Sequence, residues 1–165
     1  MNFIWNKNLE LFKNRFPQLY QILNKSSTSQ IVVETAKNGS PTAREGNLQL
    51  HSKYNPEKEA ETFVSNFDSE KKDILIFFGF GLGYSLIEAC KKFPEHTIIA
   101  FESKEDHFFF ALENIDWSQV FSHEKLILVI GADEKSSAQI LNQYPFSRIQ
   151  VFRSKSQSEH DKEYF

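Results

Sequence analysis

Three glycines at alternate positions lie in the middle of the chain: Gly79, Gly81 and Gly83. They follow an apolar run at residues 74–78 and precede an amphipathic stretch that begins at Tyr84, an order that predicts a buried strand, a tight turn and a helix. Glycines in such a turn leave no side chains over the first N–H groups of the helix, where the helix dipole attracts anions. The motif therefore predicts a nucleotide or another anionic ligand. The alternative is that the glycines only permit the turn.

Two acidic residues stand where a nucleotide-binding fold would use them. Glu102 ends the apolar run that begins at Thr97, about 20 residues after the glycines, where such a fold places a ribose-binding acid. Asp133 follows a third apolar run. Each acid also has a structural interpretation, because an acid beside the start of a helix can bond its free N–H groups. For Asp133, which precedes a helix expected at 134–143, the structural interpretation is favoured.

The spacing of the glycines restricts the kind of nucleotide. The dinucleotide fingerprint needs Gly or Ala where the bulky Tyr84 stands, so NAD and FAD are not expected. A P-loop is excluded because no Gly-Lys-Ser/Thr follows. The spacing is closer to that of methyltransferases that use S-adenosylmethionine, although Phe77 and Phe78 replace the acid that usually precedes their glycines. The candidate ligand-binding residues of this region are Gly79, Gly81, Gly83, Tyr84, Glu102 and Asp133.

A polar connector precedes the glycine motif and adds three candidates: His51, Lys53 and Tyr54. A connector that carries His, Ser, Lys and Tyr together suits a phosphate or a sugar, and a turn that satisfies its own polar groups is an equal alternative. The other histidines show no spacing typical of a metal site, so no metal is expected. Of these, His96 and His123 are expected to be exposed.

The elements that must position these residues fall into two parts. The first part predicts an amphipathic helix at 9–23 interrupted at Pro17, a strand at 31–35, a returning strand at 47–51 and a helix from Pro56 to about residue 67. The second part alternates apolar strands with helices, which indicates a parallel sheet covered on both faces. The expected strands are 74–78, 97–101, 126–130 and 149–152, and the expected helices are 84–93, 104–114 and 134–143, with a short turn near 117–121.

The predicted fold class is therefore α/β. It is a Rossmann-like, mostly parallel sheet with helices on both faces, preceded by a small N-terminal helix and an antiparallel β-hairpin. We expect a helix and hairpin subdomain at 1–55, the α/β domain at 56–153 and a polar tail or linker at 154–165.

Composition and charge restrict the expected partners and cellular location of the protein. The net charge of −3, with both signs interspersed, argues against a nucleic-acid partner. No stretch approaches the length of a membrane span, and the N-terminus lacks the features of a signal peptide. Cys90 is the single cysteine, expected in the core, so no intrachain disulfide can form and a cytoplasmic location is expected.

Three segments together resemble a known family. Leu50-His-Ser-Lys-Tyr-Asn-Pro-Glu-Lys-Glu-Ala60, Phe77-Phe-Gly-Phe-Gly-Leu-Gly-Tyr84 and Ala100-Phe-Glu102 look like the N-terminal domain of the motility-associated factor (Maf) glycosyltransferases. The resemblance implies bacterial flagellin glycosylation with nonulosonic acids carried on CMP. It also implies a catalytic centre in a further domain downstream, so this chain is expected to be an accessory domain, and its catalytic residues are unknown.

Three functions follow as hypotheses. The first is an accessory domain of a Maf-type glycosyltransferase that binds a nucleotide-type ligand such as a CMP-sugar, with flagellin or the downstream catalytic domain as partner. The second is a small methyltransferase that binds S-adenosylmethionine. The third is a non-catalytic interaction module, which would use the hairpin or a phenylalanine-rich helix at 104–114 to bind flagellin or a second copy of itself.

Overall fold

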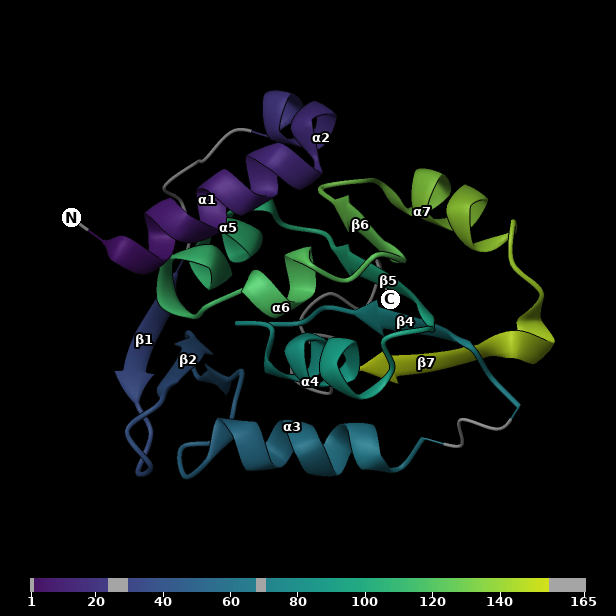
Figure 1. Cartoon of the computed structure of the whole chain (residues 1–165). Helices are drawn as coiled ribbons and strands as arrows, with labels where there is room; N and C mark the ends of the chain where they lie inside the picture. The colour runs from purple at the N-terminus through teal and green to yellow at the C-terminus, as the bar shows by residue number, and fades with distance from the viewer. Residues whose placement is uncertain (1, 24–29, 68–70, 155–165) are drawn as a thin grey trace.

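Two separate sheets and the helices around them make up the computed structural model, which describes residues 2–23, 30–67 and 71–154 (Figure 1). In chain order the elements are α1 (Phe3–Arg15), α2 (Pro17–Ile22), β1 (Ile31–Thr35), β2 (Pro41–Glu45), β3 (Leu48–Gln49), α3 (Pro56–Ser65), β4 (Ile74–Phe78), α4 (Tyr84–Lys92), β5 (Thr97–Glu102), α5 (Glu105–Asn114), α6 (Ser118–Phe121), β6 (Leu126–Ile130), α7 (Glu134–Leu141), the short 3₁₀ helix η1 (Phe146–Arg148) and β7 (Ile149–Arg153).

The N-terminal helices meet at the predicted break. Helix α1 starts earlier than expected because the side chain of Asn2 accepts the backbone N–H of Trp5, and Pro17 opens α2. Phe12 of α1 is fully buried and lies edge-on to Phe108 of α5, with ring centroids 5.0 Å apart. The first helix is thus held by the core of the α/β part.

One strand of the hairpin predicted for the first part of the chain was assigned to the wrong residues. The strand that returns against β1 is β2, and the segment expected to return, 47–51, contributes only the two residues of β3. Turns with positive φ at Gly39 (91°) and Gly46 (58°) separate the three antiparallel strands. Strand β2 begins with a proline, which a strand tolerates at its first residue, and only Thr42 and Ala43 of it are buried, so its apolar pattern is weak.

The second sheet confirms the predicted α/β core. Its four strands are parallel in the order β6-β5-β4-β7, with Ile76 of β4 opposite Ile99 of β5 and Val151 of β7. All five residues of the central strand β4 are buried. Strands β4 and β5 read as continuous apolar runs because helices cover both faces of the sheet.

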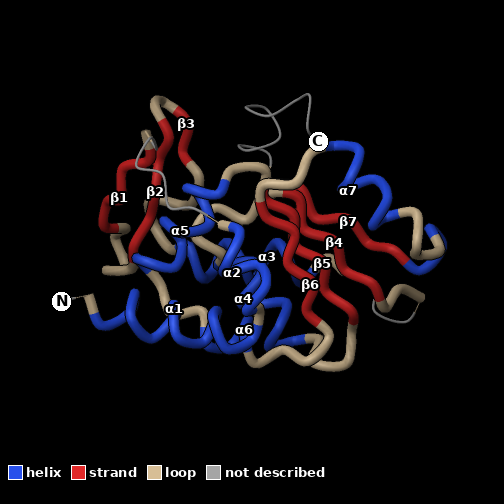
Figure 2. The backbone as a smooth tube through the Cα atoms, turned by 90° about the horizontal axis from the view of Figure 1, so that it is seen from above, coloured by secondary structure: helices blue, strands red, loops and turns tan. Residues whose placement is uncertain are grey.

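The helices divide unequally between these faces. Helix α7 lies on one face, where Ile140 and Leu141 pack against Ile76, Phe101 and neighbouring sheet residues (Figure 2). The other described α-helices gather around the larger hydrophobic cluster on the opposite face. Within the described ranges, no helix has the length and apolar character needed to cross a bilayer.

The division into two parts at residue 55 stays a prediction. The larger cluster contains Phe12, Ala43 and Leu50 from the first part together with residues of the α/β domain, so the described residues share one core. The tail expected at 154–165 lies outside the described residues from residue 155 onward, as does His160.

Candidate functional site

The glycine turn connects β4 to α4 in a conformation that other residues adopt poorly. The φ angles of Gly79, Gly81 and Gly83 are 67°, 56° and 99°, all in the left-handed region that favours glycine. The N–H of Gly79 donates to the carbonyl of Phe101 (2.9 Å), and that of Gly83 donates to Phe80 (2.8 Å). These bonds hold the turn against the carboxyl ends of β4 and β5.

Two side chains of the protein itself close over this turn. A Cβ atom at Gly81 would collide with His51 Nε2, and one at Gly83 would lie 2.6 Å from Trp117 Cζ2. The N–H of Leu82 donates to His51 Nε2 (2.8 Å), and the Trp117 indole N–H donates to the carbonyl of Leu82 (3.0 Å). The space above Gly81 and Gly83 is therefore filled by an imidazole and an indole.

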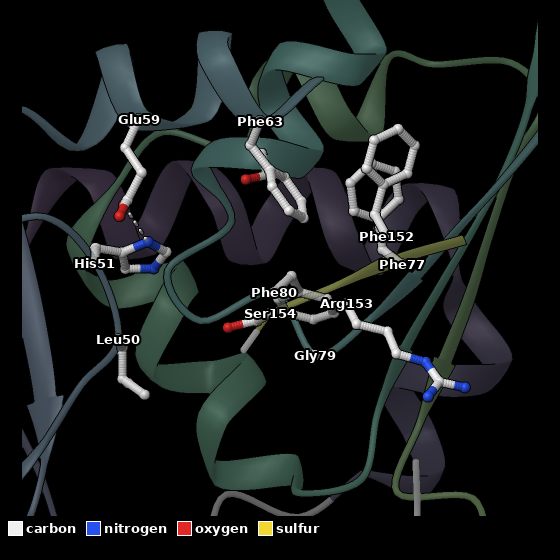
Figure 3. Close-up of a pocket in the computed structure, with 11 residues that line it drawn as sticks. Leu50, His51, Glu59, Phe63, Phe77, Gly79, Phe80, Phe152, Arg153 and Ser154 are labelled. Carbon is white, nitrogen blue, oxygen red and sulfur yellow. Dashed lines mark ion pairs between the residues drawn. The ribbon is translucent and has the colours of Figure 1, made fainter. Parts of the chain in front are cut away.

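His51 is neutral in this setting. Burial lowers its pKa from the ordinary 6.5 to about 4. Because Nε2 accepts a hydrogen bond, the proton of the neutral ring lies on Nδ1, 3.9 Å from Glu59 Oε2 (dashed line in Figure 3). The ring of Tyr84 packs edge-on against it, and the Tyr84 hydroxyl donates to the carbonyl of Pro41 (2.6 Å). Burial also raises the pKa of Tyr84.

A cavity of about 240 Å³ opens beside the turn, at the carboxyl ends of β4 and β7 and against α3 (Figure 3). Its apolar walls come mainly from aromatic side chains, and polar groups lie between them. The lining residues are Leu50, His51, Glu59, Phe63, Phe77, Gly79, Phe80, Ser85, Phe152, Arg153 and Ser154.

The cavity combines flat apolar walls with groups that attract an anion. The rings of Phe77 and Phe152 stack with centroids 4.8 Å apart, and Phe63 meets Phe152 edge-on at 5.5 Å. Arg153 follows Phe152 at the rim of the cavity; its guanidinium lies 5.6 Å from the centre of the Phe78 ring, on the face of the sheet that α7 covers, and no carboxylate of the described residues pairs with it. Ser85 belongs to the first turn of α4, whose N–H groups have no partner within the helix. A planar base and a phosphate would both find matching surfaces here.

The structure separates the residues that the sequence singled out. His51 and Gly79 line the cavity, whereas Gly81 and Tyr84 lie against His51 and are not among the lining residues. Lys53 is exposed and lines neither this cavity nor the groove next to it. The exposed ring of Tyr54 lines that neighbouring groove.

The two candidate acids lie away from the cavity. Asp133 caps α7 by accepting the N–H of Ser136 (2.7 Å), which lowers the pKa of its carboxyl group. Glu102 is fully buried, and its Oε1 accepts the N–H of Lys104 (3.2 Å). Nearby, His107 Nε2 lies 3.2 Å from Glu45 Oε1 of β2, and its Nδ1 lies 3.9 Å from Glu102 Oε1. This interior cluster ties β2 to the end of β5.

Other residues are placed differently from expectation or were missed. His123, expected to be exposed, is buried, and its Nε2 lies within hydrogen-bond distance of the carbonyl of Phe93 (3.1 Å). Cys90 is buried in the core as expected, which raises the pKa of its thiol to about 12.

Sequence reasoning missed Trp117 and Arg153. Arg153 had a usable signal, since it directly follows a predicted parallel strand, at the edge where ligands bind in open α/β sheets. Among the described residues, no cluster of His, Cys, Asp and Glu has the makings of a metal site.

A relative, a solved structure and a family model are similar to this chain. The chain is 28% identical over 130 residues to an uncharacterized protein of Treponema pallidum (strain Nichols), covering 73% of this chain and 44% of that protein. It shares its fold with the solved MAf glycosyltransferase from Magnetospirillum magneticum AMB-1, with a TM-score of 0.68 and 14% identity over 99% of this chain and 35% of that one. The chain thus spans less than half the length of either protein. A family model described as the glycosyltransferase Maf N-terminal domain matches residues 41–145, more than half of the chain. The chain therefore belongs to the family of Maf glycosyltransferase N-terminal domains.

Proposed function

We propose that this Maf N-terminal domain is an accessory domain that binds a nucleotide-type ligand, such as a CMP-sugar, in the cavity at the ends of β4 and β7. The observation that carries the proposal is a cavity with aromatic walls at the carboxyl ends of β4 and β7, with the first turn of α4 and Arg153 among its lining residues. In this proposal the base lies against Phe63 and Phe152, and the phosphate lies between Arg153 and the first turn of α4.

The family supplies the wider setting of the proposal. Transfer of a nonulosonic acid to flagellin in the cytoplasm would take place on a separate catalytic domain. One feature of the cavity, the state of His51, supports this separation of binding from catalysis. The Nε2 atom of His51 already accepts the N–H of Leu82, so it is not available as a general base.

The methyltransferase hypothesis has less support. In such enzymes the cofactor lies over the glycine turn and contacts acids after the next two strands. Here His51 and Trp117 occupy the space over the turn, Glu102 is fully buried, and Asp133 caps α7. The interaction-module hypothesis has no specific contact in its favour among the described residues.

Isothermal titration of the purified chain with CMP tests the proposal. Because Arg153 would supply a charged hydrogen bond, Arg153→Gln should weaken CMP binding by about 1.5–3 kcal/mol, or roughly 10- to 150-fold. Arg148→Gln is the matched control, since it removes the same charge at the other end of β7, where Arg148 pairs with Asp73 at the surface.

Two results would overturn the proposal: no heat of binding from wild-type protein at millimolar CMP, or equal CMP affinities for wild-type protein and Arg153→Gln. A parallel titration with S-adenosylmethionine tests the methyltransferase alternative, which micromolar binding would favour.

A further inference from the structure

Glu59 and His51 lie together at one end of the cavity and point toward each other (Figure 3). Both residues line the cavity, on the side opposite Arg153. The Glu59 Oε2 atom lies 3.9 Å from His51 Nδ1, which is longer than a hydrogen bond. The carboxylate and the imidazole are therefore neighbours that do not satisfy each other.

The glycine turn fixes which nitrogen of His51 carries the proton. Nε2 accepts the N–H of Leu82 (2.8 Å), and burial lowers the pKa of the ring to about 4, so the neutral ring carries its proton on Nδ1. The Nδ1–H group makes no hydrogen bond within the described part of the chain. His51 thus offers a hydrogen-bond donor at this end of the cavity.

Glu59 offers an acceptor beside this donor. Its Oε2 accepts the backbone N–H of Ser52 (2.9 Å), which ties the carboxylate to the connector before α3. Its Oε1 makes no hydrogen bond among the described residues. The side chain of Glu59 is 51% exposed, so a ligand can reach it, and a carboxylate has no proton to donate.

An aromatic wall and a favourable distribution of charge adjoin the pair. Phe63 follows Glu59 by four residues on α3, so the two side chains share one face of the helix, and both line the cavity. The charge of Glu59 repels a phosphate, whereas the first turn of α4, with Ser85, attracts one. The base of a nucleotide is therefore directed to the end where Glu59 and His51 lie.

A donor beside an acceptor distinguishes bases by the order of their polar groups. On cytosine, and also on adenine, an amino group stands next to a ring nitrogen that carries no proton. The amino group would donate to Glu59, and the ring nitrogen would accept from His51. Uracil and hypoxanthine carry the reverse order, a carbonyl next to a ring N–H. Their carbonyl oxygen would face the carboxylate, and their ring N–H would face the N–H of His51.

We propose that Glu59 and His51 read the base of the bound nucleotide and select a base whose amino group adjoins an unprotonated ring nitrogen. The inference rests on the nucleotide site proposed above and adds the residues that set its base specificity. Glu59 is the acceptor for the amino group, and His51 is the donor to the ring nitrogen.

Isothermal titration of the full chain with CMP and with UMP tests the inference. Wild-type protein should bind CMP about 10- to 100-fold more tightly than UMP, because UMP mispairs with both residues. Glu59→Gln should bring the two affinities within about threefold of each other, since a glutamine amide can present either its oxygen or its NH₂ group. Glu61→Gln is the matched control and should keep the preference, because it removes the same charge from an exposed residue of α3 outside the cavity.

AMP and IMP carry the same two patterns on a purine ring, and their titration identifies the ring that the cavity takes. A preference for CMP over UMP, or for AMP over IMP, that is lost in Glu59→Gln supports the inference. Equal wild-type affinities within both pairs would overturn it and leave the nucleotide site standing. A preference that survives in Glu59→Gln would also overturn it, by assigning the selection to other groups. Absence of binding for all four nucleotides would overturn the nucleotide site as well.

Discussion

Gly81 and Gly46 have almost the same backbone conformation in different surroundings. Their φ angles are 56° and 58°. A Cβ atom at Gly46 would meet open space, whereas one at Gly81 would collide with the imidazole of His51. The pair therefore distinguishes two reasons why a position requires glycine. One is the positive φ angle, and the other is the space that a neighbouring side chain needs.

Replacing each of these glycines by alanine should give unequal losses of stability. Gly46→Ala should lower the free energy of unfolding by about 1 kcal/mol, the cost of holding alanine at positive φ. Gly81→Ala should cost about 2 kcal/mol more, since His51 must move and the buried N–H of Leu82 then loses its acceptor. Urea unfolding of both variants measures the difference. Equal losses would mean that His51 yields freely and that the backbone angle alone requires Gly81.

One buried asparagine, Asn8, makes three of the hydrogen bonds that attach helix α1 to the α/β part. The side chain of Asn8 is fully buried and donates to the carbonyls of Leu112 (2.8 Å) and Ile115 (2.7 Å). Its oxygen accepts the N–H of Trp117 (2.9 Å). The asparagine thereby completes the end of α5 and fixes the segment that brings Trp117 over the glycine turn.

Asn8→Ala should destabilise the protein far more than a substitution on the exposed side of the same helix. Two carbonyls and one N–H would lose their partner in the interior, so we expect a loss on the order of 3 kcal/mol in the free energy of unfolding. Asn6→Ala, on the exposed side, should change it by less than about 0.5 kcal/mol. Chemical denaturation followed by tryptophan fluorescence measures both. A loss below about 1 kcal/mol for Asn8→Ala would show that the asparagine does not anchor the helix.

Three side-chain contacts, a seam between the two sheets, join residues 41–51 of the first part to residues 82–107 of the second. His51 accepts from Leu82, Tyr84 donates to Pro41, and Glu45 faces His107. These contacts are buried or half-buried, and the two parts share one hydrophobic cluster. We therefore expect the molecule to unfold in a single transition.

The stability of this seam should depend on pH through His51. Its pKa is about 4 in the folded protein and close to 6.5 in the unfolded chain, so the unfolded state binds the proton more readily. The stabilisation from neutral His51 is present above pH 6.5 and is lost as the pH falls from 6.5 towards 4. Between pH 7 and 4, wild-type protein should lose on the order of 3 kcal/mol more stability than His51→Gln, whose amide oxygen can still accept from Leu82.

Urea unfolding of both proteins across this pH range measures the difference. Carboxylates such as Asp73 and Asp116, whose pKa values are lowered by their partners, titrate in both proteins and cancel in the comparison. Parallel curves for the two proteins would exclude His51 as the source of the acid sensitivity.

The sequence by itself determined most of the secondary structure of the α/β part. Strands such as β4 are continuous apolar runs because both faces of the sheet are covered, and such runs are readable without knowledge of their neighbours. Pro17 and Pro56 marked helix starts for a local reason, their fixed φ. Strand β2 was missed because only Thr42 and Ala43 are buried, which leaves too short an apolar pattern to detect.

The tertiary structure alone decided what the glycine turn contacts. Local sequence fixed the need for positive φ at this turn. Whether the space above it holds a ligand or a side chain depends on residues far away in the chain, and packing brought His51 and Trp117 there. Packing also assembled the cavity, since Phe63 and Arg153 come from separate elements that approach each other only when α3 and β7 pack beside β4. Contacts between distant elements depend on how whole surfaces fit together, which no local pattern records.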